Sequence, residues 1–175
     1  MIRIKLLELS DAEGLLALNL RNREFFKPFL PTRAEELYTL DGQLKGIENN
    51  LAKRELDQHY AFGIYLKESG ELIGTVTLMD VLRGALQSCF IGYYLDEQHN
   101  GKGYMSAAVR LAVEYGFQTL GLHRIEAGVM PHNLGSIKVL ERAGFQKEGI
   151  ARKNVKINGK WEDHQVLAIL NEDDL

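Results

Sequence analysis

The chain has 175 residues, of which 45% are hydrophobic and 26% are charged, with a formal net charge of −3. These proportions are typical of a soluble globular protein with a core of its own, so we expect a single domain over residues 1–175. The near-neutral balance argues against a dedicated nucleic-acid-binding protein, which normally carries a basic face, and no direct nucleic-acid binding is expected.

Signals for export or membrane insertion are missing from the sequence. No apolar run approaches the roughly 18–20 residues of a membrane span, so no membrane partner is expected. The first ten residues alternate instead of forming the apolar centre of a signal peptide. The lone Cys89 excludes an intramolecular disulfide and fits a reducing compartment. We therefore expect a cytoplasmic protein.

The N-terminal segment predicts a strand followed by a helix. Residues 2–7 have the alternation of a strand. Ser10–Glu13 reads Ser-Asp-Ala-Glu, which matches a capping box. The leucines that follow predict a helix that extends to about Arg23.

Two prolines and a second capping pattern come next. Pro28 and Pro31 predict an extended loop, because proline cannot continue a helix and restricts the residue before it. Thr32–Glu35 matches another capping box. We expect it to open helical structure that reaches about Arg54, with an interruption near Asp41-Gly42.

The middle of the chain predicts three strands. Residues 60–66 and 71–79 flank a Glu-Ser-Gly turn at residues 68–70, which predicts a hairpin. Residues 88–95, SCFIGYYL, are apolar enough for a central strand.

The last third alternates between helices and strands. Residues 105–120 predict a buried helix, because they are apolar round most of the circumference. A strand is predicted at residues 124–129. A second helix is predicted at residues 133–143, with Gly144 as its C-terminal stop.

The C-terminus predicts a hairpin. Residues 145–157 and 162–170 are strands joined at Asn158-Gly159, a strong signal for a two-residue turn. The exposed tip of this hairpin offers a contact for a homodimer. The predicted order β-α-α-β-β-β-α-β-α-β-β indicates one α/β (α+β) domain with a mixed, mainly antiparallel sheet.

A glycine-rich loop, Asn100–Gly103, lies between the strand at 88–95 and the helix at 105–120. The first N–H groups of a helix are unpaired and attract anions. Glycines would let the backbone approach a phosphate closely. The plain alternative is a tight turn between a strand and a helix, and the loop alone leaves both open.

Other phosphate-binding motifs fail on spacing. A P-loop requires Ser or Thr after Gly-Lys, but Gly103 follows Lys102. A dinucleotide fingerprint requires a third glycine where Ser106 stands. It also requires a parallel strand-helix-strand unit with a downstream acid on its second strand, and no such unit is evident from the sequence.

Several longer segments carry a family resemblance. GYYLDEQHNGKGYM, HRIEAGVMPHN and NLGSIKVLERAGFQKEG resemble the GNAT superfamily of N-acetyltransferases, and within it the ribosomal-protein-alanine N-acetyltransferases of the RimJ/RimL type. The resemblance covers nearly the whole chain. It implies the GNAT fold, in which helices flank a central sheet with one splayed strand pair, and it implies acetyl-CoA as the co-substrate.

The resemblance also implies a coenzyme A site. The family's phosphate motif, (Gln/Arg)-x-x-Gly-x-(Gly/Ala), falls on Asn100–Met105, with departures at both ends. It places the pyrophosphate on the main-chain amides of residues 101–106 and the pantetheine on the backbone of the preceding strand. The implied cofactor-binding residues are Tyr93, Leu95, Asn100, Gly101, Lys102, Gly103, Tyr104, Met105, Ser106 and Asn133. The side chains of Tyr93 and Leu95 are expected in the core.

Two catalytic roles follow from the resemblance. The backbone N–H of Leu95 would donate to the developing oxyanion, and Ser136 would protonate the leaving thiolate. Ser136 can equally be a residue that caps or packs at a helix start. Asn133 is the N-cap of the same helix, a cofactor contact, or both.

The sequence leaves open which residue acts as the general base. One branch of the family has a glutamate at the position of Val155, which cannot act as a base. Glu126 is the candidate, with a structural salt bridge to Arg124 as the alternative. An N-terminal amine has a pKa of about 7.7–8.0 and a lysine about 10.4, so an α-amine acceptor needs much less help from a base.

The acceptor groove of the family forms near the two early prolines. We expect Arg21, Phe26, Phe29 and His132 to contact the acceptor. The aromatic residues have the hydrophobic core as an alternative. Arg21 and Arg23 could meet acidic groups of an acceptor, or RNA.

Other reactive residues support no further chemistry. Cys89 lacks a His/Asp framework in the sequence and is interpreted as a buried thiol. The five histidines lack metal-ligand spacing, so no metal is expected.

The sequence predicts an acetyl-CoA-dependent N-acetyltransferase that acts by direct attack in a ternary complex. Its most favoured acceptor is the N-terminal α-amine of a ribosomal protein. The alternatives are acetylation of a small amine, such as a polyamine, an amino acid or a toxic amino compound, and a non-catalytic acyl-CoA-binding or ribosome-assembly factor.

Overall fold

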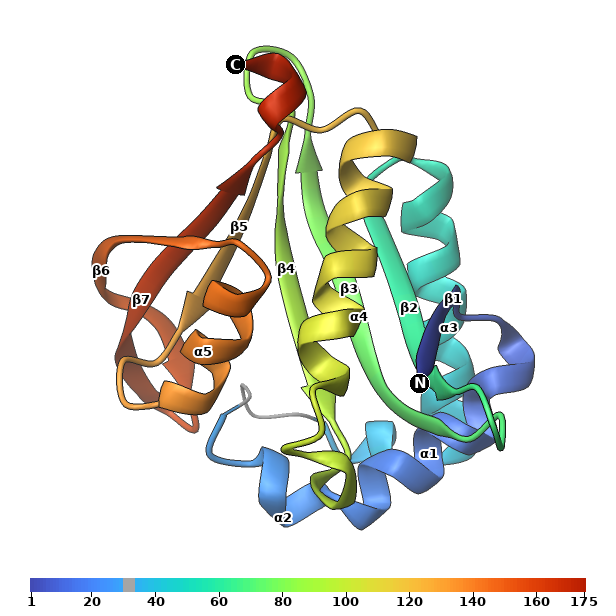
Figure 1. Cartoon of the computed structure of the whole chain (residues 1–175). Coiled ribbons are helices and arrows are strands. Elements are labelled where there is room, and N and C mark those ends of the chain that lie inside the picture. Colours follow the sequence, from blue (N-terminus) through green and yellow to red (C-terminus); the bar gives the residue numbers. More distant parts are fainter. Residues whose placement is uncertain (30–33) are drawn as a thin grey trace.

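One seven-stranded sheet organises residues 1–29 and 34–175, which the computed structural model describes (Figure 1). The strands are β1 (Ile2–Leu6), β2 (His59–Leu66), β3 (Leu72–Leu82), β4 (Ser88–Leu95), β5 (Arg124–Val129), β6 (Gln146–Ile157) and β7 (Lys160–Leu170). The α-helices are α1 (Ala12–Arg21), α2 (Arg23–Phe26), α3 (Leu40–Glu55), α4 (Tyr104–Glu114) and α5 (Leu134–Arg142). The predicted order of elements is confirmed, apart from the additional short helix α2.

The strands lie in the order β1-β2-β3-β4-β5-β7-β6. All neighbours pair antiparallel except β4 and β5, which pair parallel. The predicted mixed, mainly antiparallel sheet is confirmed. The segment β4–α4–β5 is therefore a parallel strand-helix-strand unit, which was not evident from the sequence. Periodicity shows where strands lie along the chain, but it does not show which strands become neighbours.

Helices cover both faces of the sheet and enclose two hydrophobic cores. Phe62 and Ile64 of β2 belong to a large core that includes Ala108 and Ala112 of α4. Ala61 packs instead against a smaller core between the sheet and helices α1 and α3. The cores lie on opposite faces, because neighbouring residues of a strand point to opposite sides. The fully buried alanines allow α4 to lie close to the strands.

The first capping interaction differs from the prediction at Ser10–Glu13. No capping hydrogen bond is found for Ser10 among the described residues. Instead, the N–H of Glu8 donates to the carboxylate of Asp11 at 2.8 Å, ahead of α1. The predicted box is wrong because several acidic and hydroxyl side chains compete at this helix start, and local spacing does not rank them.

The region between α1 and α3 also differs. Pro31 and Thr32 of the predicted loop and capping box lie outside the described residues. Pro28 lies in a turn, where the N–H of Phe29 donates to the carbonyl of Phe26 at 3.0 Å, so the chain is not extended there. The expected interruption near Asp41-Gly42 lies earlier, because Thr39 caps α3 through the N–H of Gly42 at 3.0 Å.

The C-terminal elements agree with their local signals. Asn133 caps α5, and the helix ends at Gly144, which has a φ of +101°. There, the N–H of Phe145 returns to the carbonyl of Leu140 at 3.0 Å, which is a Schellman ending. The helix predicted at residues 105–120 differs in its last part, because α4 ends at Glu114 and the chain continues in a wider π turn.

Asn158 and Gly159 form the turn between β6 and β7, with φ values of +51° and +82°. Positive φ at both central residues is the conformation that matches the twist of a hairpin. The side-chain amide of Asn158 donates to the carbonyl of Lys27 at 2.8 Å, so the turn is tied to the segment after α2. None of the helices within residues 1–29 and 34–175 has the length and apolar character needed to cross a membrane.

Candidate functional site

The sheet opens where β4 and β5 separate. The two strands pair only over residues 88–90 and 124–126. Beyond that point β4 stays paired with β3, and β5 stays paired with β7. The facing edges of β4 and β5 are then without a strand partner, and a cavity of about 600 Å³ lies there. The predicted splayed strand pair is confirmed.

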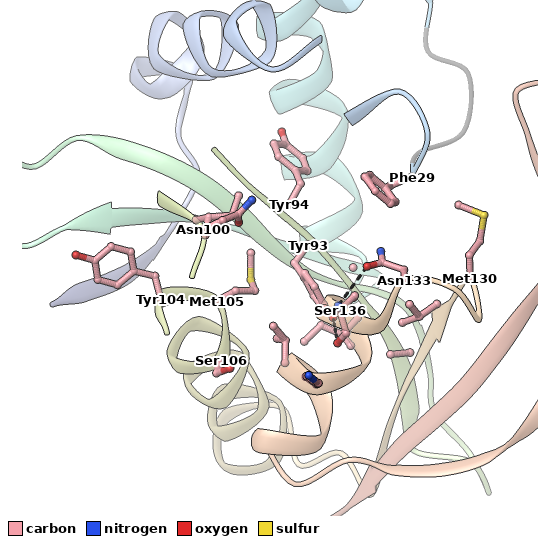
Figure 2. A pocket seen from close by; sticks show the side chains of 18 of the residues that line it. Phe29, Tyr93, Tyr94, Asn100, Tyr104, Met105, Ser106, Met130, Asn133 and Ser136 are labelled. Carbon is pink, nitrogen blue, oxygen red and sulfur yellow. Dashed lines mark hydrogen bonds between the residues drawn. The ribbon is translucent and has the colours of Figure 1, made fainter. Parts of the chain in front are cut away.

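The end of β4, the glycine loop, the end of β5 and the start of α5 line this cavity, together with residues of α2 and β7. In Figure 2, Asn100 and Met105 lie on one side of Ser136, and Phe29 and Met130 lie on the other. The cavity therefore has a loop side and an aromatic side, with a hydroxyl group between them.

The glycine loop has a backbone that requires glycine. Gly101 and Gly103 have φ values of +78° and +79°, a region that residues with a Cβ seldom enter. An added Cβ would meet no atom within 4 Å at either position, so the backbone angle and not crowding selects glycine. In the described part of the chain no acceptor is found for the N–H groups of residues 101–106. Free amides at a helix N-terminus are an arrangement that binds anions.

The open edge of β4 presents the N–H of Leu95. The N–H of the next residue, Asp96, donates to the carbonyl of Ile73 in β3 at 2.7 Å. Amides alternate in direction along a strand, so the N–H of Leu95 points away from β3 and toward the gap. The side chain of Leu95 is buried in the core, as expected.

Three side chains meet at the start of α5 (Figure 2). Asn133 is the N-cap, since its Oδ1 accepts from the N–H of Ser136 at 3.3 Å. The hydroxyl of Tyr93 lies 2.6 Å from Oγ of Ser136 and donates to the Ser136 carbonyl at 3.3 Å. Tyr93 thus does more than fill the core, because its hydroxyl fixes the position of the serine hydroxyl.

Tyr93 keeps its proton at neutral pH. Burial raises the pKa of its hydroxyl to about 12, although the hydrogen bond with Ser136 acts in the opposite direction. Tyr93 has one hydroxyl proton, which can go to the carbonyl or to Oγ of Ser136; where it goes to Oγ, the serine proton is free to point into the cavity. The pair is then a hydrogen-bond donor aimed at whatever group lies there.

An aromatic wall closes the side opposite the loop. Phe25, Phe26 and Phe29 all line the cavity, and the ring centroids of Phe26 and Tyr94 lie 4.8 Å apart. Phe26 is buried, whereas Phe29 is 40% exposed. The expected position of Phe26 and Phe29 at the site agrees with the structure, and Phe26 also packs in the protein interior.

Arg21 lies in a different place from the one expected. Its guanidinium pairs with the buried carboxylate of Asp96 at 2.7 Å, and Arg21 is not among the residues that line the cavity. Burial would raise the pKa of Asp96, but the hydrogen bonds from Arg21 and from the N–H of Gln98 lower it overall. Since Asp96 precedes the glycine loop, this pair holds that loop against the end of α1.

Three further residues expected at the site lie outside the cavity lining. The carboxylate of Glu126 pairs with Arg124 at 2.7 Å, which is the structural alternative to a base. His132 and Lys102 have exposed side chains. Glu126 shares a strand face with Arg124, and the guanidinium holds its carboxylate there.

His164 of β7 lines the cavity, although the sequence pattern did not select it. Its side chain is buried and lies next to Gly128 of β5, 3.7 Å from where a Cβ would be. Alternation along the last strand could have grouped His164 with Glu162 and Val166. That signal does not show that β7 lies beside the strand whose end lines the cavity.

The remaining reactive groups lie elsewhere. Cys89 is a buried thiol, as predicted, and burial raises its pKa to about 12. The described residues include one group with metal-ligand atoms close together, formed by Glu71, Asp96 and His99. Because Arg21 already places a positive charge against Asp96, this group supports no metal proposal.

Comparisons with known proteins identify the fold and its chemistry. Residues 2–146 match the family described as Acetyltransferase (GNAT) domain. The chain belongs to this family. It is accordingly an N-acetyltransferase, with acetyl-CoA as its acetyl donor.

Three GNAT relatives are similar over nearly the whole chain. The probable N-acetyltransferase YjcK of Bacillus subtilis is 60% identical, and the match covers 99% of this chain and 96% of YjcK. The [ribosomal protein uS5]-alanine N-acetyltransferase of Escherichia coli is 35% identical, over 97% of this chain and 88% of that protein. The structure of Mycobacterium smegmatis RimJ in complex with CoA-disulfide has a TM-score of 0.92 at 28% identity and covers 98% and 83% of the two chains.

Proposed function

We propose that this enzyme acetylates the α-amine of a protein's N-terminal residue, with a ribosomal protein as the first candidate. The observation that carries the proposal is the cavity between β4 and β5, which joins free backbone amides on one side to an aromatic wall on the other. A donor and an acceptor can occupy one such cavity together. This arrangement favours direct attack of the amine on the thioester in a ternary complex.

The loop side fits the phosphates of the donor. Six N–H groups, those of residues 101–106, are free of acceptors among the described residues and lie at the positive end of α4. They would hold the pyrophosphate, with the side chains of Asn100, Tyr104 and Met105 beside it. The unpaired edge of β4 would hold the pantetheine as an added strand, by means of the backbone of Tyr93 and Leu95.

The centre of the cavity fits the reacting thioester. The N–H of Leu95 would donate to the oxyanion that develops on the acetyl carbonyl. The hydroxyl of Ser136, supported by Tyr93, would give a proton to the departing thiolate. Asn133 would hold the start of α5 in place and contact the donor. No covalent acetyl-enzyme is required, and Cys89 is not among the residues that line the cavity.

The aromatic side fits a peptide N-terminus. Phe26, Phe29 and Met130 offer apolar contacts near the point where the amine must enter. An α-amine has a pKa of about 7.7–8.0, so a useful fraction is already neutral near pH 7.5. The E. coli relative is named for an alanine of ribosomal protein uS5, which supports a protein acceptor and a cytoplasmic place of action.

A panel of acceptors tests the proposal. We would incubate the enzyme and acetyl-CoA with alanine-initiated and serine-initiated hexapeptides, with the same peptides blocked at the N-terminus but carrying a free lysine, and with spermidine. Mass spectrometry should find acetyl groups on the free N-termini and not on the lysine of the blocked peptides. Acetylation of spermidine alone would contradict the peptide acceptor. A rise in melting temperature with acetyl-CoA but no turnover on any amine would identify a binding protein.

A further inference from the structure

We propose that His164 is the general base that accepts the proton of the attacking amine. This inference deepens the proposed function and rests on it. His164 is a residue of β7 whose side chain is 7% exposed and lines the same cavity as Ser136. No carboxylate is found among the described residues that line this cavity, and His164 is the one histidine there.

The imidazole lies where an acceptor can reach it. It faces Gly128 near the end of β5, beyond the last residues at which β5 still pairs with β4. A Cβ at Gly128 would lie 3.7–4.0 Å from atoms of the His164 side chain, so the ring occupies the space beside a residue that has no side chain. The ring therefore borders the gap between the splayed strands.

The hydrogen bonds of the ring define its tautomer. Nδ1 of His164 lies 3.1 Å from the carbonyl oxygen of Glu162 and 2.9 Å from Oδ1 of Asn154. A backbone carbonyl can only accept, so Nδ1 must carry the proton. In the neutral ring Nε2 then has the free lone pair. Among the described residues no hydrogen-bond partner is found for Nε2, which leaves it available to an amine.

A distortion of the sheet supports this arrangement. The pairing of β6 with β7 passes from Ala151 opposite His164 to Val155 opposite Glu162. Residues 152–154 therefore face the single residue Asp163. Bulges of this kind disrupt the ladder and are frequent next to active sites, where they redirect side chains.

The bulge has its own internal support. Lys153 has a φ of +46°, and its N–H donates to the carboxylate of Asp163 at 2.8 Å. The chain thus adopts an unfavourable backbone angle that brings Asn154 beside the imidazole. A regular strand would alternate through this region and would leave no spare residue to orient the ring. Asn154 is a positioning residue in this scheme, and His164 is the catalytic one.

The proposed step balances as follows. The acceptor nitrogen forms a bond to the acetyl carbonyl carbon, and the bond from that carbon to sulfur breaks. The proton lost by nitrogen goes to Nε2 of His164 and from there to solvent. Coenzyme A leaves as the thiolate and takes up one proton, so that an amide and a free thiol are formed. His164 would thus supply the base that the sequence lacks at Val155.

Two variants separate the base from the structural role of the ring. His164→Asn retains a side-chain N–H donor near the position of Nδ1 but lacks Nε2. His164→Ala leaves space in which added imidazole can bind. We would measure kcat and both KM values with acetyl-CoA and an amine of the panel above that the wild type acetylates. His123→Asn is the matched control, because His123 pairs with Asp174 near the C-terminus and is not among the residues that line the cavity.

We expect both His164 variants to lose about 100-fold in kcat, at the low end of the usual range for a general base. The KM for acetyl-CoA should stay within about twofold, and free imidazole should restore part of the turnover of His164→Ala. Asn154→Ala should reduce kcat less than His164→Ala does, because the carbonyl of Glu162 still orients the ring; the KM for acetyl-CoA should not change.

The outcomes distinguish the two proposals. Wild-type kcat in His164→Asn, or no effect of imidazole on His164→Ala, would overturn the role of His164 and leave the proposed function intact. A wild type that acetylates no amine of the panel would overturn the proposed function, and this inference with it.

Discussion

The two sides of the cavity present different kinds of group to a ligand. The proposed donor side lies mainly on one continuous stretch, residues 91–106, and it offers mainly backbone groups: the open edge of β4 and the free amides at the start of α4. The proposed acceptor side is assembled from side chains of α2, the β5–α5 connection and β7. A backbone site depends on chain conformation and tolerates changes of side chain. A site of side chains depends on which distant segments fold together.

The largest expected effect comes from a substitution that strains the backbone of the glycine loop. Gly103→Val should weaken acetyl-CoA binding by about 100-fold. A β-branched residue at a φ of +79° strains the loop by about 1–2 kcal/mol. A shift of the loop that relieves this strain would lose an amide contact to a charged phosphate, which is worth about 1.5–3 kcal/mol of binding. Isothermal titration calorimetry with acetyl-CoA measures this loss.

Gly70→Val is the matched control for the Gly103 variant. Gly70 has a φ of +75° and equally open surroundings, but it lies in the turn between β2 and β3. It should show the same backbone strain in its stability and retain wild-type affinity for acetyl-CoA. Equal loss of affinity in both variants would show that strain alone explains the result.

The second prediction tests the role of Ser136 at the centre of the cavity. Ser136→Ala should lower kcat by about 30-fold, which is below the usual range for an acid catalyst because a thiolate leaves readily. Acetyl-CoA affinity should stay near the wild-type value, since the donor is held mainly by amides. Steady-state kinetics combined with calorimetry would check both quantities, and an unchanged kcat would remove Ser136 from the mechanism.

The third prediction removes the ion pair that holds the glycine loop against the end of α1. Arg21→Ala leaves the buried carboxylate of Asp96 without its partner. It should cost about 2 kcal/mol, less than a fully buried pair because Arg21 is 37% exposed. A loss of this size is up to about 30-fold in the folding equilibrium. Urea denaturation at neutral pH would measure it.

The dependence of this loss on pH has a definite sign. The folded state lowers the pKa of Asp96, so the ionised carboxylate contributes stability at neutral pH, and that contribution is lost as the pH falls through the lowered pKa. The gap in unfolding free energy between wild type and Arg21→Ala should therefore narrow in acid. A gap that stays constant from pH 7 to strongly acidic pH would contradict the role of this pair.

The smallest effect is expected from a substitution of Phe29, one residue of the aromatic wall. Phe29→Ala should raise the KM for the acceptor peptide by about fivefold, because Phe29 is only partly buried and loses about 1 kcal/mol of apolar contact. The KM for acetyl-CoA and the melting temperature should not change. Leu86→Ala is a suitable control, since Leu86 is an exposed apolar residue that is not among the cavity residues.

The donor side was largely predictable from the sequence. β4 and β5 have the predicted boundaries, and the glycine loop leads into a helix as expected. These features depend on local signals: an apolar strand, positive-φ glycines and a helix start. The N-cap role of Asn133 and the stop at Gly144 were predictable for the same reason.

The acceptor side was much less predictable. Arg21 and Glu126 have charged side chains that could point toward the cavity or away from it. Arg21 pairs with Asp96, which the sequence did not predict, and Glu126 pairs with Arg124, which was predicted only as an alternative. The sequence did not predict the position of His164 at the cavity, because that position depends on β7 lying beside β5 and on a bulge in β6. Both are contacts between distant segments, and local periodicity carries no information about them.

The open edge of β4 also bears on solubility. An unpaired strand edge is a template on which another chain can add a strand and start aggregation. Here the edge lies in the interior of the sheet, with α4 and α5 on one face of the gap (Figure 1). Arg110 of α4 donates to the carbonyl of Arg142 at the end of α5 at 2.8 Å, which joins the two helices. We infer that this edge stays accessible to a thin, flexible ligand, whereas a second protein strand would have to enter between β4 and β5, which remain paired at one end.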